Sequence, residues 1–321
     1  MRGFFHFVKF MIEDHRKYIQ HQRTDFVVYV VLNILIVLTL YYGVIVAFPL
    51  MFDTCSTPVL MLNYLWGVWL YVAEQSNLQL IRLRDSSIFT EGDVQSDVTT
   101  GRKDAVSRGT QGKPLTRTDR DSTISRRSKV PDSWHYCVPC EVTVPPRAWH
   151  CSTCRSCILR RDHHCVFAMQ CIGIKNQCNF MGFLLYTAAG TLYATVLSFL
   201  IAVYIQGVSC WVWLLRNVLI FYVILFDFSL NNLLASLNFI GCVFSVGVLV
   251  YYIRLSLAGQ TSADHSRNVC RKVPGRSMFS LETMREFLGP SPFLRVAWPF
   301  HEVLPNGSYN SNDMKRFEKH Q

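Results

Sequence analysis

The sequence predicts an α-helical polytopic membrane protein in which four transmembrane helices flank a cysteine-rich domain. Two observations predict this fold class. Of the 321 residues, 50% are hydrophobic and only 17% are charged, and the apolar residues gather in long blocks rather than at amphipathic spacing. Seven of the 12 cysteines fall within 35 residues near the middle of the chain.

Four blocks are long enough to cross a bilayer as helices, which takes about 20 predominantly apolar residues. They carry no charged residue and comprise residues 26–48, 54–73, 181–204 and 232–253. Residues 211–228 are also apolar, but Arg216 and Asp227 leave only ten uncharged residues between them. Ten residues are too few to cross, so we expect an interfacial or re-entrant segment there.

The basic residues set the expected orientation. Lys and Arg number 5 before the first span, 0 between spans one and two, 16 between two and three, 1 between three and four, and 10 after four. Because basic loops stay in the cytosol, both termini and the central segment are expected there. The net charge of +10 is then mostly a topology signal. Membrane lipid is an expected partner, and nucleic acid is not, since no aromatic platform accompanies the scattered basic residues.

The cysteine cluster predicts metal binding. Between Cys137 and Cys171 the order is Cys-x2-Cys-x9-His-Cys-x2-Cys-x2-Cys-x4-Asp-His-His-Cys-x5-Cys. In the reducing cytosol such a cluster binds metal rather than forming disulfides. Two structural zinc ions, each with four ligands, would use eight of these ten groups. One thiol and one imidazole remain, and a spare Cys beside a spare His and an Asp is typical of an activated thiolate nucleophile.

The cluster and its surroundings resemble the DHHC-type protein S-acyltransferases, or palmitoyltransferases. Two spans precede the domain and two follow it, as in that family. Residues 259–264 look like a degenerate form of the family's Thr-Thr-x-Glu motif, and residues 284–289 stand where it has an aromatic, glycine-ended motif. The match covers every metal-ligand position, His164 among them, and also Arg147, Asp162, His163, Cys165, Gly173, Asn176 and Phe180.

The resemblance implies the roles of individual residues. The nucleophile would be Cys165, with His163 as its base and Asp162 as the group that orients the imidazole. One zinc ion would be held by Cys137, Cys140, His150 and Cys157, and a second by Cys151, Cys154, His164 and Cys171. Spacing alone does not select this interleaved pairing.

The implied function is acyl transfer to proteins. A long-chain acyl group, typically palmitoyl, would pass from acyl-CoA as co-substrate to Cys165 and then to cysteine thiols of substrate proteins at the cytosolic membrane face. The acyl chain would lie among the spans, where the small residues at 188–190 either leave room for it or serve helix contact. Arg147, Arg160 and Arg161 are candidates to meet the CoA phosphates.

These inferences divide the chain into six parts. Residues 84–133 are expected to be a disordered linker, because they are rich in polar residues and almost free of aromatics. The other parts are a cytosolic N-terminus (1–25), spans one and two (26–83), the cysteine-rich zinc domain (134–180), spans three and four (181–253) and a cytosolic C-terminal region (254–321). The expected location is an endomembrane, Golgi or endoplasmic reticulum, rather than the plasma membrane.

Departures from the family pattern keep other functions open. Relatives follow the nucleophile with Pro-Trp-Val-Asn-Asn, whereas residues 166–170 are Val-Phe-Ala-Met-Gln. The Thr-Thr-x-Glu motif is altered at its second and fourth positions, and Val144 replaces a basic residue. One alternative is therefore a catalytically silent membrane scaffold. A ubiquitin ligase is another, although it would need a Cys-His-Cys centre that this chain does not show.

Two further cysteines, Cys55 and Cys210, fall in segments that the topology places outside the cytosol. An oxidising compartment would allow a disulfide between them. Two unpaired thiols at the ends of apolar spans are the simpler expectation.

Overall fold

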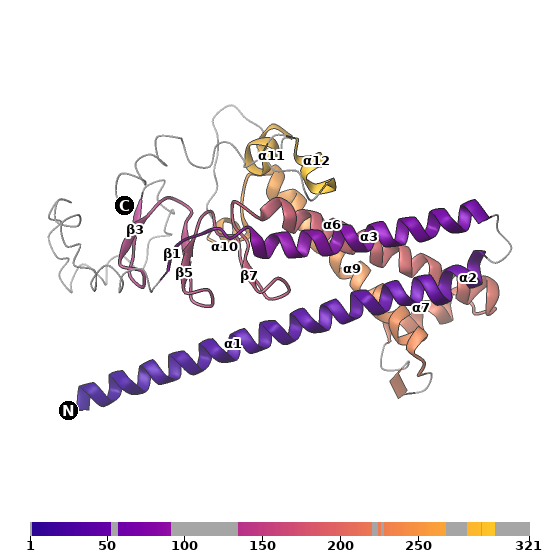
Figure 1. Ribbon diagram of the computed structural model, residues 1–321, viewed down its shortest axis with the longest axis horizontal. Coiled ribbons are helices and arrows are strands. Elements are labelled where there is room, and N and C mark those ends of the chain that lie inside the picture. The colour runs from indigo at the N-terminus through magenta and orange to yellow at the C-terminus, as the bar shows by residue number, and fades with distance from the viewer. Residues whose placement is uncertain are drawn as a thin grey trace.

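The computed structural model describes residues 2–52, 57–90, 134–219, 224–225, 228–267, 281–289 and 291–298. The protein is mostly helical, with long helices running side by side and short strands gathered at one end of them (Figure 1). The long helices are α1 (Arg2–Tyr41), α3 (Thr57–Leu83), α6 (Gln177–Leu200) and α9 (Leu230–Leu257). Helix α6 packs against both α3 and α9.

By length and composition, three segments among the described residues can cross a membrane, so the chain is an integral membrane protein. They are Gln20–Met51, Gln177–Ile205 and Leu230–Leu257. The first joins α1 to a π-helical stretch, η1 (Tyr42–Ala47), and to α2 (Phe48–Phe52), and the second continues α6 into another, η2 (Ile201–Ile205). Most of their apolar side chains face outward, as expected in lipid.

The predicted second span, residues 54–73, does not reach the same hydropathy. Helix α3 has 27 residues and includes the polar Asn63, Glu74 and Asn77. It nevertheless lies alongside α6 over much of its length (Figure 1). Cys55 lies outside the described residues, so its pairing with Cys210 stays a prediction.

The ambiguous apolar segment contains a short helix, α7 (Cys210–Val218). Its 9 residues extend about 13 Å, too little to cross a membrane, as predicted for this segment. The ring of Trp213 packs edge-on against Phe199 and Phe239, and Ser236 of α9 donates a hydrogen bond to the side-chain oxygen of Asn217. Helix α7 is therefore fastened to α9. Residues 220–223 and 226–227 lie outside the described part.

The cysteine-rich domain consists of short antiparallel hairpins. Strand β2 (His135–Cys137) pairs with β3 (Val142–Val144), β4 (Trp149–Cys151) with β5 (Ser156–Ile158), and β6 (His164–Cys165) with β7 (Gln170–Cys171). Their turns place Glu141, Arg155 and Met169 in the left-handed region, with φ of 53°, 51° and 53°. Strands of two or three residues cannot build a core, so cysteine side chains occupy its centre.

The expected linker begins later than predicted. Strand β1 (Ser87–Thr90) pairs with β5 and completes a sheet of order β1-β5-β4, so the prediction of disorder from residue 84 is wrong for residues 87–90. The buried Ser86 accepts the backbone N–H of Leu159 at 2.9 Å and that of Lys175 at 3.1 Å. Ile88 packs against the hydrophobic cluster that contains Val144 and Leu159, while the strand pairs with the edge of β5. Residues 91–133 lie outside the described residues.

The domain is seated on the membrane helices through buried contacts. The Asn176 side chain donates to the carbonyls of Ile81 in α3 and Cys171 in β7, at 3.1 and 3.0 Å, and accepts the N–H of Gly173 at 2.8 Å. A Cβ on Gly173 would lie 2.7 Å from the carbonyl oxygen of Leu159, so only glycine fits. Three short helices complete this end: α10 (Ser262–Ser266), α11 (Leu281–Leu288) and α12 (Pro292–Ala297).

Candidate active site and metal sites

The first set of cysteine and histidine side chains belongs to the β2–β3 and β4–β5 hairpins. Sγ of Cys140 lies 3.2 Å from Nδ1 of His150 and 3.6 Å from Sγ of Cys157. With Cys137, these residues place all four ligand atoms within 4.8 Å of one another. Each hairpin brings two of these ligands together: the β2–β3 hairpin carries Cys137 and Cys140, and His150 lies opposite Cys157 on β4 and β5.

The second set joins the β4–β5 turn to the β6–β7 hairpin. Nδ1 of His164 lies 3.2 Å from Sγ of Cys154, 3.7 Å from that of Cys171 and 3.8 Å from that of Cys151. The four ligand atoms again lie within 4.8 Å of one another. The structure thus brings together the same two interleaved sets that the family resemblance implies.

Both sets suit zinc. Four sulfur and nitrogen donors at zinc distances of about 2.0 to 2.3 Å form a tetrahedron whose sulfurs are about 3.8 Å apart. The sulfurs of Cys140 and Cys157 are 3.6 Å apart, as are those of Cys154 and Cys171. A disulfide needs about 2.05 Å, so these pairs have the spacing of shared metal ligands rather than of disulfides.

Cys165 is the cysteine of the cluster that neither set includes. It lies on β6 beside His164 and is 4% exposed, in a core formed with Leu78, Ile81 and Phe180 of the membrane helices. The nucleophile predicted from the sequence is therefore outside the metal sets, at the boundary between the cysteine-rich domain and the helices. Val166 and Phe167, which follow it, are partly exposed.

The His163 side chain bridges Cys165 and Asp162. Its Nδ1 lies 3.2 Å from Oδ1 of Asp162, and its ring packs edge-on against Phe180. Burial lowers the pKa of the His163 imidazole, but hydrogen bonds to Asp162 and Cys165, together with their negative charges, outweigh burial and raise the pKa to about 9. Protonated His163 is thus stabilised between a carboxylate and a thiol, the arrangement that an activated cysteine needs.

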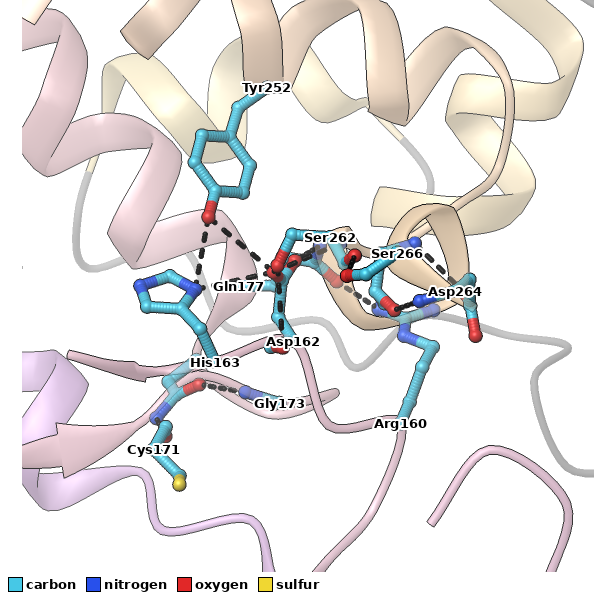
Figure 2. A network of polar contacts seen from close by, with 12 residues as sticks. Arg160, Asp162, His163, Cys171, Gly173, Gln177, Tyr252, Ser262, Asp264 and Ser266 are labelled. Atoms are coloured by element: carbon cyan, nitrogen blue, oxygen red, sulfur yellow. Dashed lines mark hydrogen bonds and ion pairs between the residues drawn. The ribbon is translucent and has the colours of Figure 1, made fainter. Parts of the chain in front are cut away.

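Asp162 is the centre of a polar network and is only 3% exposed (Figure 2). Its Oδ1 accepts the backbone N–H of Ser262 at 3.1 Å and also the Ser262 hydroxyl, and its Oδ2 accepts the side-chain amide of Gln177 at 3.2 Å. The hydroxyl of Tyr252 lies 3.0 Å from Nδ1 of His163. Three segments, α6, α9 and α10, therefore fix the carboxylate and the imidazole relative to each other.

The altered Thr-Thr-x-Glu motif makes two of these contacts. Thr261 and Asp264 form a capping box that starts α10, and Ser262, at the second position of the motif, binds Asp162. Asp264, at the fourth position, forms an ion pair with Arg147. The substituted residues thus keep polar contacts to the site, and these departures do not disconnect α10 from it.

The three arginines expected to meet CoA phosphates are engaged inside the protein. Arg160 is fully buried and donates to Oε1 of Gln177 at 2.9 Å, so the expectation is wrong for Arg160. A side chain without exposed surface cannot reach a phosphate. Arg147 binds Asp264 and the carbonyl of Gly259, and Arg161 lies beside the sulfurs of Cys171 and Cys151. Arg147 and Arg161 remain half-buried.

An apolar cavity of about 370 Å³ opens from this centre into the helices. Both His163 and Cys165 line it, as do Phe180, Phe183, Leu184 and Tyr252. Helices α1, α3, α6 and α9 all contribute further lining residues. Gly190 faces the cavity, and a Cβ there would meet nothing within 4 Å, which favours the cavity over helix contact as the reason for this small residue.

Sequence reasoning missed several residues of the site. Tyr252 and Gln177 reach Asp162 or His163 from α9 and α6, and no local motif marks them. Asp25 of α1 contacts His164, and its signal was a lone carboxylate directly before an apolar span.

Comparison with known proteins gives two matches. Residues 130–269 match the family model described as DHHC palmitoyltransferase. A curated protein of Danio rerio, the probable palmitoyltransferase ZDHHC24, is 37% identical over 170 residues, which cover 49% of this chain and 54% of that protein. The match thus spans about half the length of the relative.

Proposed function

Because the chain belongs to the DHHC palmitoyltransferase family, we propose that it is a protein S-acyltransferase. It takes a long-chain acyl group such as palmitoyl from acyl-CoA onto Cys165 and transfers it to cysteine thiols of substrate proteins at the cytosolic membrane face. One observation carries this proposal: Cys165 and His163 together line an apolar cavity that continues among the membrane helices.

The first half-reaction loads the enzyme. The proton of the Cys165 thiol passes to His163 before acyl-CoA reacts, which leaves a thiolate beside an imidazolium, and the thiolate attacks the carbonyl carbon of the acyl-CoA thioester. The new bond between Cys165 sulfur and that carbon replaces the bond between the carbon and the sulfur of CoA. The CoA thiolate leaves with the proton held by His163. Asp162 keeps the imidazolium in place through its contact with Nδ1.

The second half-reaction transfers the chain. His163 takes the proton of a substrate cysteine, and the substrate thiolate attacks the acyl carbon on Cys165. The acyl group leaves Cys165 as its sulfur recovers the proton from His163. Because the same imidazole serves both halves, its fixation by Asp162 and Tyr252 supports the whole cycle.

The cavity accommodates the acyl chain during both halves. It follows α6 from Phe180 to Leu197, about 25 Å at 1.5 Å per residue, which suits a long chain. Apolar side chains line most of the cavity. A hydrocarbon chain inside it therefore stays in an apolar environment and is not exposed to water. The thioester carbon then stays at Cys165 while the chain points into the membrane.

We assign one zinc ion to each of the two cysteine and histidine sets. Zinc bound there supplies folding stability, because the short hairpins have little hydrophobic core of their own. Neither set includes a catalytic residue. The chain's own residues at the boundary, Asp162, His163 and Cys165, carry the reaction.

The membrane topology follows from the same arrangement. We place α3 as a fourth span, because Leu62, Leu65 and Val68 face outward while its polar Glu74 accepts a hydrogen bond from Thr187 of α6 at 2.7 Å. Four spans leave both termini and the zinc domain on the cytosolic side, in agreement with the basic residues. Residence in Golgi or endoplasmic reticulum membranes remains part of this proposal.

The remaining contacts concern CoA and protein substrates. Arg147 and Arg161 keep partly exposed side chains while bonded within the protein, and both remain proposed contacts for CoA phosphates. Substrate proteins would present their cysteine near the partly exposed Val166 and Phe167, which follow the nucleophile.

Autoacylation of the purified full-length protein tests this function. Incubation with labelled palmitoyl-CoA should give one hydroxylamine-sensitive label per chain, and Cys165→Ser should remove it. Cys210→Ser changes an exposed cysteine outside the site and should label like the unchanged protein. Transfer to a cysteine-containing substrate protein is then scored separately. Absence of label on the unchanged, zinc-loaded protein would favour the scaffold alternative.

A further inference from the structure

The outer nitrogen of His164 has a partner from a different part of the chain. While Nδ1 faces the sulfurs of the second set, Nε2 lies 2.8 Å from Oδ2 of Asp25. Asp25 belongs to α1, near the cytosolic end of the segment Gln20–Met51, and is separated from His164 by 139 positions. The contact therefore joins the first membrane helix to the zinc-binding hairpin.

The carboxylate of Asp25 is buried, so it needs a hydrogen-bond donor inside the protein. The residue is 5% exposed, and a carboxylate so shielded from water is costly unless a donor or a positive charge faces it. With Nδ1 turned to the sulfurs, Nε2 carries the ring proton and donates it to Asp25. The contact is thus a directed hydrogen bond between a helix residue and a candidate metal ligand.

Metal-binding histidines commonly donate their second ring N–H to a carboxylate, which fixes the tautomer and ring orientation and makes the ligand nitrogen more basic. We propose that Asp25 is a positioning residue for His164, which holds Nδ1 toward the second set and strengthens zinc binding there. This inference rests on the zinc assignment of the second set and is independent of acyl transfer.

The same bond has a consequence for the active site. His164 immediately precedes Cys165 on β6, and the β6–β7 hairpin carries both. Farther along the first span, Leu32, Leu35 and Ile36 line the cavity. Asp25 therefore links the helix that lines the cavity to the strand that carries the nucleophile.

A matched control lies in the same pocket. Asp85 also borders the polar pocket beside His164, but its carboxylate accepts from Ser87 and Gln170. Asp85→Asn thus removes a charge from the same pocket without touching the His164 bond. Asp25→Asn is nearly isosteric and keeps an oxygen acceptor, whereas Asp25→Leu removes the acceptor.

The experiment measures zinc release from the full-length purified protein in excess chelator. Two zinc ions per chain should leave the unchanged protein slowly. In Asp25→Leu one of the two should leave about 10- to 100-fold faster, with Asp25→Asn in between and the other zinc unaffected. Asp85→Asn should match the unchanged protein. If Asp25→Leu does not fold, the nearly isosteric Asp25→Asn decides by the same readout.

Three outcomes would overturn the proposal. Equal release from all variants would show that Asp25 does not support His164. Parallel acceleration of both zinc ions would show a general loss of folding instead. Fewer than two zinc ions in the unchanged protein would refute the zinc assignment itself, and autoacylation of Cys165, scored in the same samples, shows whether the enzymatic proposal fails with it.

Discussion

The hydroxyl oxygen of Tyr252 lies 3.0 Å from Nδ1 of His163. Tyr252 lies near the C-terminal end of α9, and its ring also packs edge-on against Phe180 of α6. Two membrane helices thus hold the imidazole that we propose as general base. The hydroxyl is also 3.5 Å from Oδ1 of Asp162, so tyrosine, imidazole and carboxylate form one cluster.

Tyr252→Phe should slow autoacylation by about 2- to 10-fold. The loss of one hydrogen bond worth roughly 0.5 to 1.5 kcal/mol corresponds to that range when about 1.4 kcal/mol changes a rate tenfold. Zinc content should stay at two per chain. Tyr251→Phe is the control, because Tyr251 packs against Tyr252 but its side chain is partly exposed. Equal label kinetics in Tyr252→Phe and unchanged protein would remove Tyr252 from the catalytic cluster.

Local sequence patterns predicted the parts of the site that lie close together in the chain. Cys-x2-Cys spacing indicates which ligands one turn can present, and the surplus of one Cys and one His indicated a thiolate beside an imidazole without saying which residues they are. The family resemblance was needed to pair the ligands across hairpins. The structure brings together the same two sets.

Contacts between distant segments could not be predicted in this way. Asp25, Gln177 and Tyr252 reach the site only because the helices that carry them pack around the zinc domain. The burial of Arg160 could not be predicted either, because the sequence does not show whether an arginine beside the catalytic motif faces solvent or the core. Strand β1 was missed because its four residues, Ser-Ile-Phe-Thr, stand at the start of a long polar stretch, and their partner β5 lies about 70 positions away in the chain.

Cys151→Ala should act through folding. Cys151 is one of four donors of the second set, and structural zinc supplies much of the stability of such domains. Zinc content should fall from two toward one per chain, with lower expression and loss of autoacylation as a consequence. Cys165→Ser should keep both zinc ions. A well-folded, two-zinc but inactive Cys151→Ala protein would instead give Cys151 a catalytic role.

Met169→Asn should stabilise the protein. Met169 has φ of 53° in the tight turn of the β6–β7 hairpin, where the N–H of Ala168 bonds the carbonyl of Cys165. The left-handed conformation costs roughly 1 kcal/mol for an ordinary side chain and less for asparagine. We expect a gain of about 0.5 to 1 kcal/mol, measured as a higher unfolding temperature of the zinc-loaded protein. Val166→Asn, in the same turn without positive φ, should bring no gain, and equal gains from both variants would contradict this explanation.

Gly190→Phe should shift acyl-CoA preference toward shorter chains. Gly190 lines the cavity about three turns of α6 below Phe180, and the space beside its Cα is open. A phenyl group there would fill the far part of the cavity without meeting protein atoms at its first carbon. Competition between labelled acyl-CoAs of different length measures the change as a ratio of autoacylation rates. Gly247→Phe is the matched control, because Gly247 on α9 also has open space beside it but does not line the cavity. If both variants fold and keep the selectivity of the unchanged protein, the acyl chain does not reach Gly190, and the cavity assignment must be restricted to the part nearer Cys165.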